Sequence, residues 1–311
     1  MTTPIILYHY NASPYAWKVR KALGIKGLAW QSVKTPVTLP KPDLVRMTGG
    51  YRGVPVMQLG ADIFIDSGLI MAELEARWPE PTLYPNGNSG LPQGLAFWTA
   101  NWFTTCFQLL AAKIGDKFPD DFKADRKAMF PTIDIDALAA GAEPFGAKGA
   151  QAAAEFRAHA ALVNEQLADG RDFLQGPRPS RADIEAGFPL VFVGHVMGDL
   201  AWLIKGLDRL APWFERLEAL GEGDRADLPA EDAQRTAAEA MPAETGFDAD
   251  DPVDIAPGTS VVVKATDANR GEVAGEIVGL GVARMSVRRQ AEGVGDVVVH
   301  FPRAGFRLHA G

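Results

Sequence analysis

Hydrophobic positions change their spacing twice along the chain, and these changes divide it into three regions. Residues 5–78 combine short apolar runs, typical of strands, with apolar residues at helical spacing. Residues 95–220 contain helical patterns alone, and residues 258–308 contain β-branched runs separated by turn residues. The pattern therefore predicts an α/β region, an all-α region and an all-β region, in that order.

The first region predicts the element order β-α-β, an irregular stretch, and then β-β-α. We expect strands at 5–10 and 30–37, and a strand pair within 55–66 that turns at Gly60. One helix begins at Pro14 and loses its pattern at Gly24, and a second begins after Asp66 and Ser67 and ends at Pro79.

The middle region predicts a helical bundle. Its helical patterns cover 96–114, 148–168, 180–197 and 211–220. The third of these opens with Ser180-x-x-Asp183, which is close to a capping box, and its interior is apolar nearly all round. We therefore expect this helix at the centre of the bundle.

The last region predicts a small antiparallel β-barrel-like domain built from four strands. An acidic segment precedes it, in which residues 229–241 could form a helix. We therefore place domains at residues 1–85, 91–222 and 257–311, with an acidic linker at 223–256.

Charge and composition exclude several classes of function. The formal net charge is −8, and residues 221–251 alone hold 10 acidic and 2 basic residues. No basic patch is left for nucleic acid, and no apolar run of about 18 residues predicts a membrane span. The start of the chain has no secretory pattern, and the single cysteine fits a reducing compartment, so we expect a cytoplasmic protein. The five histidines show no metal-ligand spacing, and no metal is expected.

Four motifs in this order resemble those of cytosolic glutathione transferases: SPYAWKVRKAL (13–23), GVPV (53–56), DSGLIMAELE (66–75) and GPRPSRADI (176–184). The first is similar to the zeta-like pattern of that family, and the resemblance covers residues 5 to about 220. It implies a thioredoxin-like, glutathione-binding first domain and an all-helical second domain. The β region beyond them resembles the tails of a bacterial subfamily.

Ser13 is the candidate catalytic residue. The glutathione thiol has an ordinary pKa near 8.5, so an enzyme must favour its thiolate. A helix start offers free amides and partial positive charge, and a serine hydroxyl adds a hydrogen bond. The alternative for Ser13 is a purely structural role, because a serine directly before a proline is a common N-cap sequence at a helix start. Three nearby tyrosines compete for the thiol contact: Tyr8, Tyr10 and Tyr15. Cys106, in an aromatic helix, is expected to be an inert core thiol.

The resemblance assigns the remaining glutathione contacts. It implies a cis bond between Val54 and Pro55 that frees the Val54 backbone to pair with the cysteinyl residue of glutathione. It also implies that Ser67 binds the γ-glutamyl carboxylate and that Asp66 pairs with the ammonium. Lys41 and Arg52 are the nearest candidates for the glycine carboxylate. The segment GGYRGVP (49–55) departs from the family pattern, which puts the role of Arg52 in doubt.

The function predicted from the resemblance is a homodimeric glutathione transferase-like enzyme that uses glutathione as co-substrate. The activated thiol would attack a small hydrophobic electrophile or drive an isomerisation. Aromatic and polar residues of the first long helix are candidates for the second-substrate cleft: Phe97, Trp98, Asn101, Trp102 and Phe107.

The alternative is a non-catalytic binding protein of the same fold that acts through its C-terminal β domain. Its candidate exposed residues are His300, Phe301, Arg303 and Phe306. A third, weaker reading is a thiol oxidoreductase with Ser13 in the usual cysteine position.

Overall fold

The computed structural model describes residues 3–131, 147–198 and 200–311. Its first region contains the predicted strands and helices in the predicted order: β1 (Ile6–His9), α1 (Pro14–Lys26), β2 (Ala29–Lys34), β3 (Val56–Leu59), β4 (Asp62–Ile65) and α3 (Ser67–Arg77). Between β2 and β3, where the sequence predicts only an irregular stretch, the chain forms the additional helix α2 (Pro42–Thr48). Strand β1 pairs with β2 in parallel and with β3 in antiparallel orientation, and β4 follows β3 in a hairpin. This is the thioredoxin-like arrangement that the sequence predicts.

Helix α1 runs past the expected stop at Gly24 and ends at Gly27, which has a positive φ of 61° and caps it. Gly24 has a packing role instead. A Cβ at this position would lie 2.4 Å from the carbonyl oxygen of Gly221, so only glycine lets the two segments approach this closely.

The helical domain contains α4 (Gly90–Ile114), a short 3-10 turn (Gly115–Lys117), α5 (Asp120–Met129), α7 (Ala147–Gln166), α8 (Arg181–Met197), α9 (Ala201–Ile204) and α10 (Leu210–Ala219). Helix α8 packs against α1, α4 and α10, so it lies at the centre as expected. The amide and hydroxyl of Ser180 both donate to Asp183, which also accepts hydrogen bonds from Leu174 and Trp213. These bonds fix the start of α8.

The C-terminal extension, residues 223–311, continues the sheet of the first domain. It contains β5 (Asp224–Asp227), α11 (Ala230–Ala238), β6 (Ser260–Ala265), β7 (Glu272–Leu280), β8 (Arg284–Ala291), β9 (Gly295–Pro302) and β10 (Phe306–Ala310). Strand β5 pairs with β2, and β9 pairs with β4, both in parallel. The result is one ten-stranded sheet with the order β10-β6-β7-β8-β9-β4-β3-β1-β2-β5.

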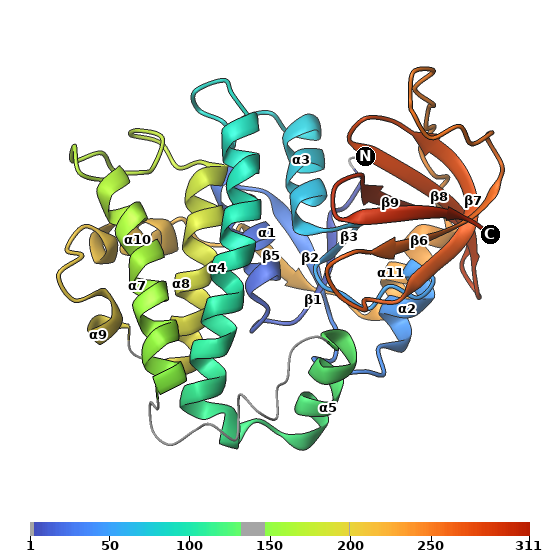
Figure 1. Ribbon diagram of the computed structural model, residues 1–311. Coiled ribbons are helices and arrows are strands. Elements are labelled where there is room, and N and C mark those ends of the chain that lie inside the picture. Colours follow the sequence, from blue (N-terminus) through green and yellow to red (C-terminus); the bar gives the residue numbers. More distant parts are fainter. Residues whose placement is uncertain (1–2, 132–146, 199) are drawn as a thin grey trace.

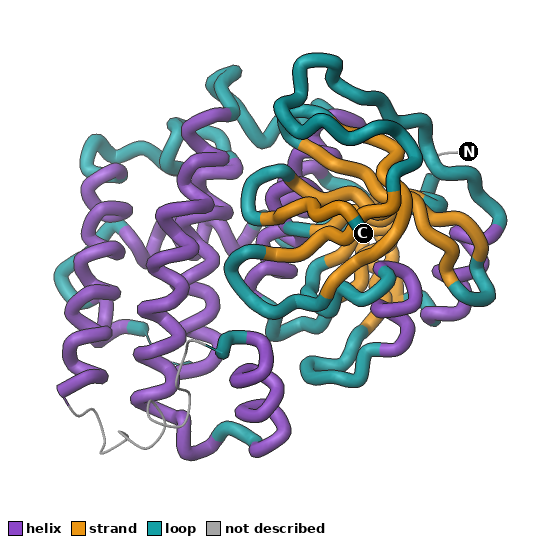
Figure 2. The backbone as a smooth tube through the Cα atoms, turned by 45° about the vertical axis from the view of Figure 1, so that its right-hand side comes forward, coloured by secondary structure: helices purple, strands orange, loops and turns teal. Residues whose placement is uncertain are grey.

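This continuity differs from the separate barrel-like domain and linker that the sequence suggests. The extension has five strands after the acidic segment rather than four, and the acidic segment itself supplies β5 and the expected helix, α11. Figure 1 shows β6–β9 beside the first domain, on the side away from α7, and Figure 2 shows the strands gathered away from the helical domain. Strand β5 is charged and largely exposed, so its sequence carries no hydrophobic signal.

Two hydrophobic cores lie on opposite faces of the sheet. Leu7 and Met57 face α1, α3 and the helical domain, whereas Ile6 and Tyr8 face α2, α11 and the extension. The strands of the first domain are therefore buried on both faces, which explains their nearly continuous apolar runs. Among the described residues, no helix is long and apolar enough to span a bilayer.

Candidate active site

A cavity of about 500 Å³, the central cavity, lies where the first domain, the helical domain and the extension meet. Its walls come from the start of α1, the segment before β3, the start of α3, α4 and α8, and three loops of the extension. Val54, Pro55, Asp66 and Ser67 line it together. The structure thus brings four of the sequence-predicted site residues to one space.

Asp66 and Ser67 form the turn that opens α3. Asp66 accepts hydrogen bonds from the amides of Gly68 (2.7 Å) and Leu69 (3.4 Å) and therefore caps the helix. Its φ of 81° is in a region that side chains rarely occupy, and such backbone outliers cluster at functional sites. The Ser67 hydroxyl has no hydrogen-bond partner among the described residues, so it is free to bind a ligand at the helix start.

Val54 and Pro55 lie immediately before β3, whose pairing with β1 begins at Val56. The peptide bond between them is cis, in agreement with the expectation from the resemblance. Both residues face the central cavity.

Ser13 acts as the N-cap of α1. Its Oγ accepts a hydrogen bond of 3.2 Å from the amide of Ala16, and the residue is only 3% exposed. It is not among the residues that line the cavity. Pro14 has no N–H, so the amide of Tyr15 is the open donor of the first helical turn.

Tyr15 lines the cavity, unlike Ser13. Its ring packs edge-on against Phe103 and tilted against Phe188, and its hydroxyl has no hydrogen-bond partner among the described residues. Burial raises the pKa of Tyr15, so the phenol stays protonated at neutral pH and can donate a hydrogen bond.

The other two tyrosine candidates lie elsewhere. The Tyr8 hydroxyl donates to Gln58 Oε1 at 2.9 Å, and burial, followed by the nearby Asp43, raises its pKa. The Tyr10 ring lies beneath the ammonium of Lys41. Neither Tyr8 nor Tyr10 lines the cavity.

Lys41 and Arg52 belong to a buried charged cluster beside α5. The Lys41 ammonium donates to the Arg52 carbonyl at 3.2 Å, and the Arg52 guanidinium pairs with Asp125, which also pairs with Arg126. Burial, together with Arg126 and Arg52, lowers the pKa of Lys41 to about 8. Neither Lys41 nor Arg52 lines the cavity, whereas Val54 and Ser67 do.

Sequence reasoning missed a buried charged group on the cavity wall. The Lys18 ammonium lies 2.5 Å from Glu185 Oε2, and Arg181 Nε donates to Glu185 Oε1 at 3.1 Å. Glu185 is the last charged residue before the long apolar run of α8, and this is the signal in the sequence that could have revealed it.

The extension supplies further cavity residues that the sequence could not place. Arg303 and Phe306, two of the candidate exposed residues of the β domain, line the cavity. Arg270, which no sequence pattern indicates, lines it as well. His300 and Phe301 are instead buried, at 2% and 1% exposure.

Of the candidate cleft residues in α4, Phe97 lines the cavity, and its neighbours Ala96 and Ala100 do so too. Trp98 and Trp102 pack around His159, and Phe107 stacks on Phe118. Cys106 is buried and its thiol donates to the carbonyl of Pro189, as expected for a core thiol.

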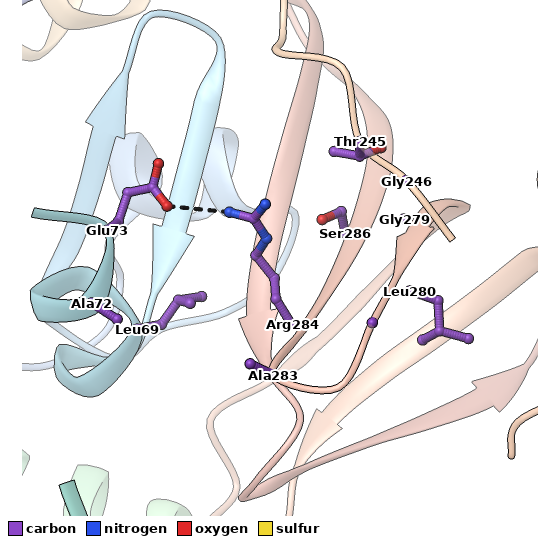
Figure 3. A pocket seen from close by; sticks show the side chains of 11 residues that line it. Leu69, Ala72, Glu73, Thr245, Gly246, Gly279, Leu280, Ala283, Arg284 and Ser286 are labelled. Carbon is purple, nitrogen blue, oxygen red and sulfur yellow. Dashed lines mark hydrogen bonds and ion pairs between the residues drawn. The ribbon is translucent and has the colours of Figure 1, made fainter. Parts of the chain in front are cut away.

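A second hollow, of about 340 Å³, lies between α3 and the extension (Figure 3). Its charged lining residues, Glu73 and Arg284, form an ion pair of 3.2 Å with each other. The central cavity, with its unpartnered hydroxyls, is therefore the better candidate for a ligand site. Among the described residues, no group of acidic, histidine and cysteine side chains could hold a metal ion.

Comparisons with known proteins agree with this architecture. Residues 7–82 match the family model of the glutathione S-transferase N-terminal domain. A GST-like protein from Pseudomonas syringae is 32% identical, with a TM-score of 0.79 and 100% coverage of both chains. A glutathione transferase from Phanerochaete chrysosporium is 18% identical, with a TM-score of 0.56, and covers 72% of this chain and 100% of its own. A comparison with curated proteins gave no match.

The Pseudomonas syringae protein is similar to this chain over its whole length, including the extension. The Phanerochaete chrysosporium enzyme is similar in fold to only a part of the chain. The matched family model and this full-length relative lead to one conclusion: the chain belongs to the cytosolic glutathione S-transferase superfamily.

Proposed function

We propose that the protein is a glutathione transferase-type enzyme that binds glutathione in the central cavity. The observation that carries the proposal is that Val54–Pro55 and Asp66–Ser67, which two strands separate in the chain, line the same cavity. In this proposal the hydroxyl and the backbone amide of Ser67, at the start of α3, bind the γ-glutamyl carboxylate, and Asp66 binds the ammonium. Val54 pairs with the cysteinyl backbone.

The thiol then lies at the start of α1, where two hydroxyls compete for it. Ser13 is favoured by its position as N-cap, and Tyr15 by its place on the cavity wall and its unpartnered hydroxyl. A hydrogen bond to sulfur, together with the open amide of Tyr15, stabilises the thiolate, whose proton passes to solvent. The sulfur forms a bond to an electrophilic carbon, and that carbon's leaving group departs with the electron pair of the bond that breaks. The apolar part of the wall, which includes Phe97 and Phe306, suits a small hydrophobic second substrate.

Titration calorimetry with reduced glutathione tests the proposal. Ser67→Ala should weaken binding about tenfold, because a charged ligand group loses a hydrogen bond. The melting temperature should stay unchanged, because the hydroxyl has no protein partner. Ser89→Ala, at the exposed start of α4 and outside the cavity, is the matched control. Absence of binding to the wild-type protein at millimolar glutathione would overturn the proposal.

A panel of electrophiles then separates the enzyme from the alternative, a non-catalytic binding protein of the same fold that acts through its C-terminal β domain. Conjugation that requires glutathione supports the enzyme. Binding without any turnover of the panel supports the non-catalytic alternative.

A further inference from the structure

Three loops of the extension form one side of the central cavity. Asp267 and Arg270 come from the loop between β6 and β7, Val282 and Ala283 from the loop between β7 and β8, and residues 302–306 from the β9–β10 connection. The extension is therefore part of the candidate glutathione site itself, and its charged residues there need an explanation.

The loop that carries Arg270 is fixed to the segment that leads into Val54. The Arg52 amide donates a 2.8 Å hydrogen bond to the Arg270 carbonyl. Gly50 and Gly271 face each other so closely that a Cβ on Gly271 would lie 2.1 Å from the Gly50 carbonyl oxygen. The unusual glycines of the segment 49–55 thus allow the extension to approach the site.

The Arg270 side chain extends toward the cavity and is only 17% exposed. Its Nε and Nη2 donate to Asp267 at 3.2 and 2.6 Å, and Asp267 is itself 60% exposed. Nη1 has no ion-pair partner among the described residues. Burial raises the pKa of the neighbouring Tyr51 to about 12, and the charge of Arg270 and its hydrogen bond to the phenol oppose that rise.

The other cationic side chains near the cavity either form ion pairs with acidic residues or do not line the cavity. Lys18 and Arg181 both pair with the buried Glu185, and Arg303 pairs with Asp251 at 3.2 Å. Lys41 and Arg52, the sequence-based candidates for the glycine carboxylate, do not line the cavity. Arg270 is therefore the cavity cation that lies next to the segment before Val54.

Glutathione carries a carboxylate at each end. In the proposed binding mode, the cysteinyl residue pairs with Val54 and the γ-glutamyl end lies at Asp66–Ser67. The glycine carboxylate at the other end of the peptide then needs a cationic partner. The partly open guanidinium of Arg270, with its planar fork of donors, suits a carboxylate.

We propose that Arg270 binds the glycine carboxylate of glutathione, so that the C-terminal extension supplies a residue of the glutathione site. This inference rests on the proposed function. It names a residue outside the regions that the four sequence motifs cover, and it gives the extension a role in recognition of the co-substrate.

Titration calorimetry with glutathione and with its glycine ethyl ester tests the inference. The wild-type protein should bind glutathione about tenfold more tightly than the ester, because the ester lacks the charge that Arg270 recognises. Arg270→Met should bind both ligands equally, with an affinity similar to that of the wild-type protein for the ester. Arg270→Lys, which keeps the charge and loses the fork, should give an intermediate ratio.

Arg307→Met is the matched control, because Arg307 is an exposed arginine of β10 outside the cavity. It should keep the wild-type ratio. A folded Arg270→Met protein with the wild-type ratio would overturn the inference and leave the proposed function intact. If Arg270→Met does not fold, Arg270→Gln supplies the same ratio. A wild-type protein that binds neither ligand would overturn the proposed function and this inference together.

Discussion

Nε2 of His300 lies 2.9 Å from Oδ1 of Asp62, and this contact joins the extension to the first domain in the interior of the sheet. Nδ1 of the same ring lies 2.9 Å from the Ser286 hydroxyl. Asp62 accepts a further hydrogen bond from the amide of Ala243 through Oδ2. Ser286 is 2% exposed and lies within β8, so we interpret the serine, histidine and aspartate as a structural joint.

Asp62→Ala should destabilise the protein by about 2–4 kcal/mol, because it leaves Nε2 of the buried His300 ring and the Ala243 amide without a partner. Urea unfolding measures the change. Asp296→Ala removes an exposed aspartate from β9 and should change the free energy of unfolding by less than about 0.5 kcal/mol. Equal losses in the two variants would contradict a joint at Asp62.

Stability should fall as the pH drops below 6.5. Burial lowers the pKa of His300, and burial together with Arg20 and Arg225 lowers that of His9 to about 3. Below pH 6.5, the ordinary histidine pKa, the unfolded chain therefore binds protons that the folded protein does not, so the free energy of unfolding decreases. Each histidine contributes up to about 1.4 kcal/mol per pH unit between its folded pKa and 6.5.

Urea unfolding between about pH 7.5 and 5 measures this slope. His9→Gln should make the slope shallower, because one of the two groups is lost. An unchanged slope in that variant would show that His9 takes up protons equally in both states.

Ser13→Ala and Tyr15→Phe separate capping from thiol activation. Ser13→Ala should lower the free energy of unfolding by about 1 kcal/mol, because the Ala16 amide loses its acceptor. Tyr15→Phe should leave stability nearly unchanged, because its hydroxyl has no described partner. Ultraviolet absorption of the bound thiolate measures the pKa of glutathione in each variant. The residue that contacts sulfur is the one whose loss raises that pKa.

Gly271→Ala should weaken both the fold and glutathione binding. Gly271 has a φ of 86°, and the added methyl would clash with the Gly50 backbone, so we expect a loss of about 1–3 kcal/mol. Gly258→Ala is the control, since Gly258 has a similar φ of 82°, has no atom near its missing Cβ and lies outside the central cavity. Calorimetry of glutathione binding should show a larger loss for Gly271→Ala, and equal losses would argue against the close approach.

Local patterns explain how much of the site the sequence could predict. Ser13, Val54–Pro55 and Asp66–Ser67 each lie in a short motif whose turn or helix start can be recognised from neighbouring residues. Arg270 has no such motif. It reaches the cavity because β9 pairs with β4, and more than 200 residues separate those strands in the chain. The homodimer and the cytoplasmic location stay predictions.

The elements of the fold show the same contrast between local sequence patterns and long-range pairing. Strong hydrophobic periodicity predicts the strands and helices of the first two regions, whereas the charged β5 is formed by backbone pairing with β2 and leaves no pattern. Lys41 and Arg52 precede the predicted site residues closely in the chain. The Arg52 side chain pairs with Asp125, and the Lys41 ammonium donates to the Arg52 carbonyl, and sequence proximity could not reveal either contact.

The ten-stranded sheet also has a consequence for solubility. Exposed strand edges invite pairing with other chains, and natural proteins protect such edges with short, charged strands. By adding β5 beside β2 and β9 beside β4, the extension leaves neither side of the thioredoxin-like sheet open to a foreign strand. The outermost strands are then β5, of four residues with three charges, and β10, of five residues. The chain thus ends its sheet in two poor templates for aggregation.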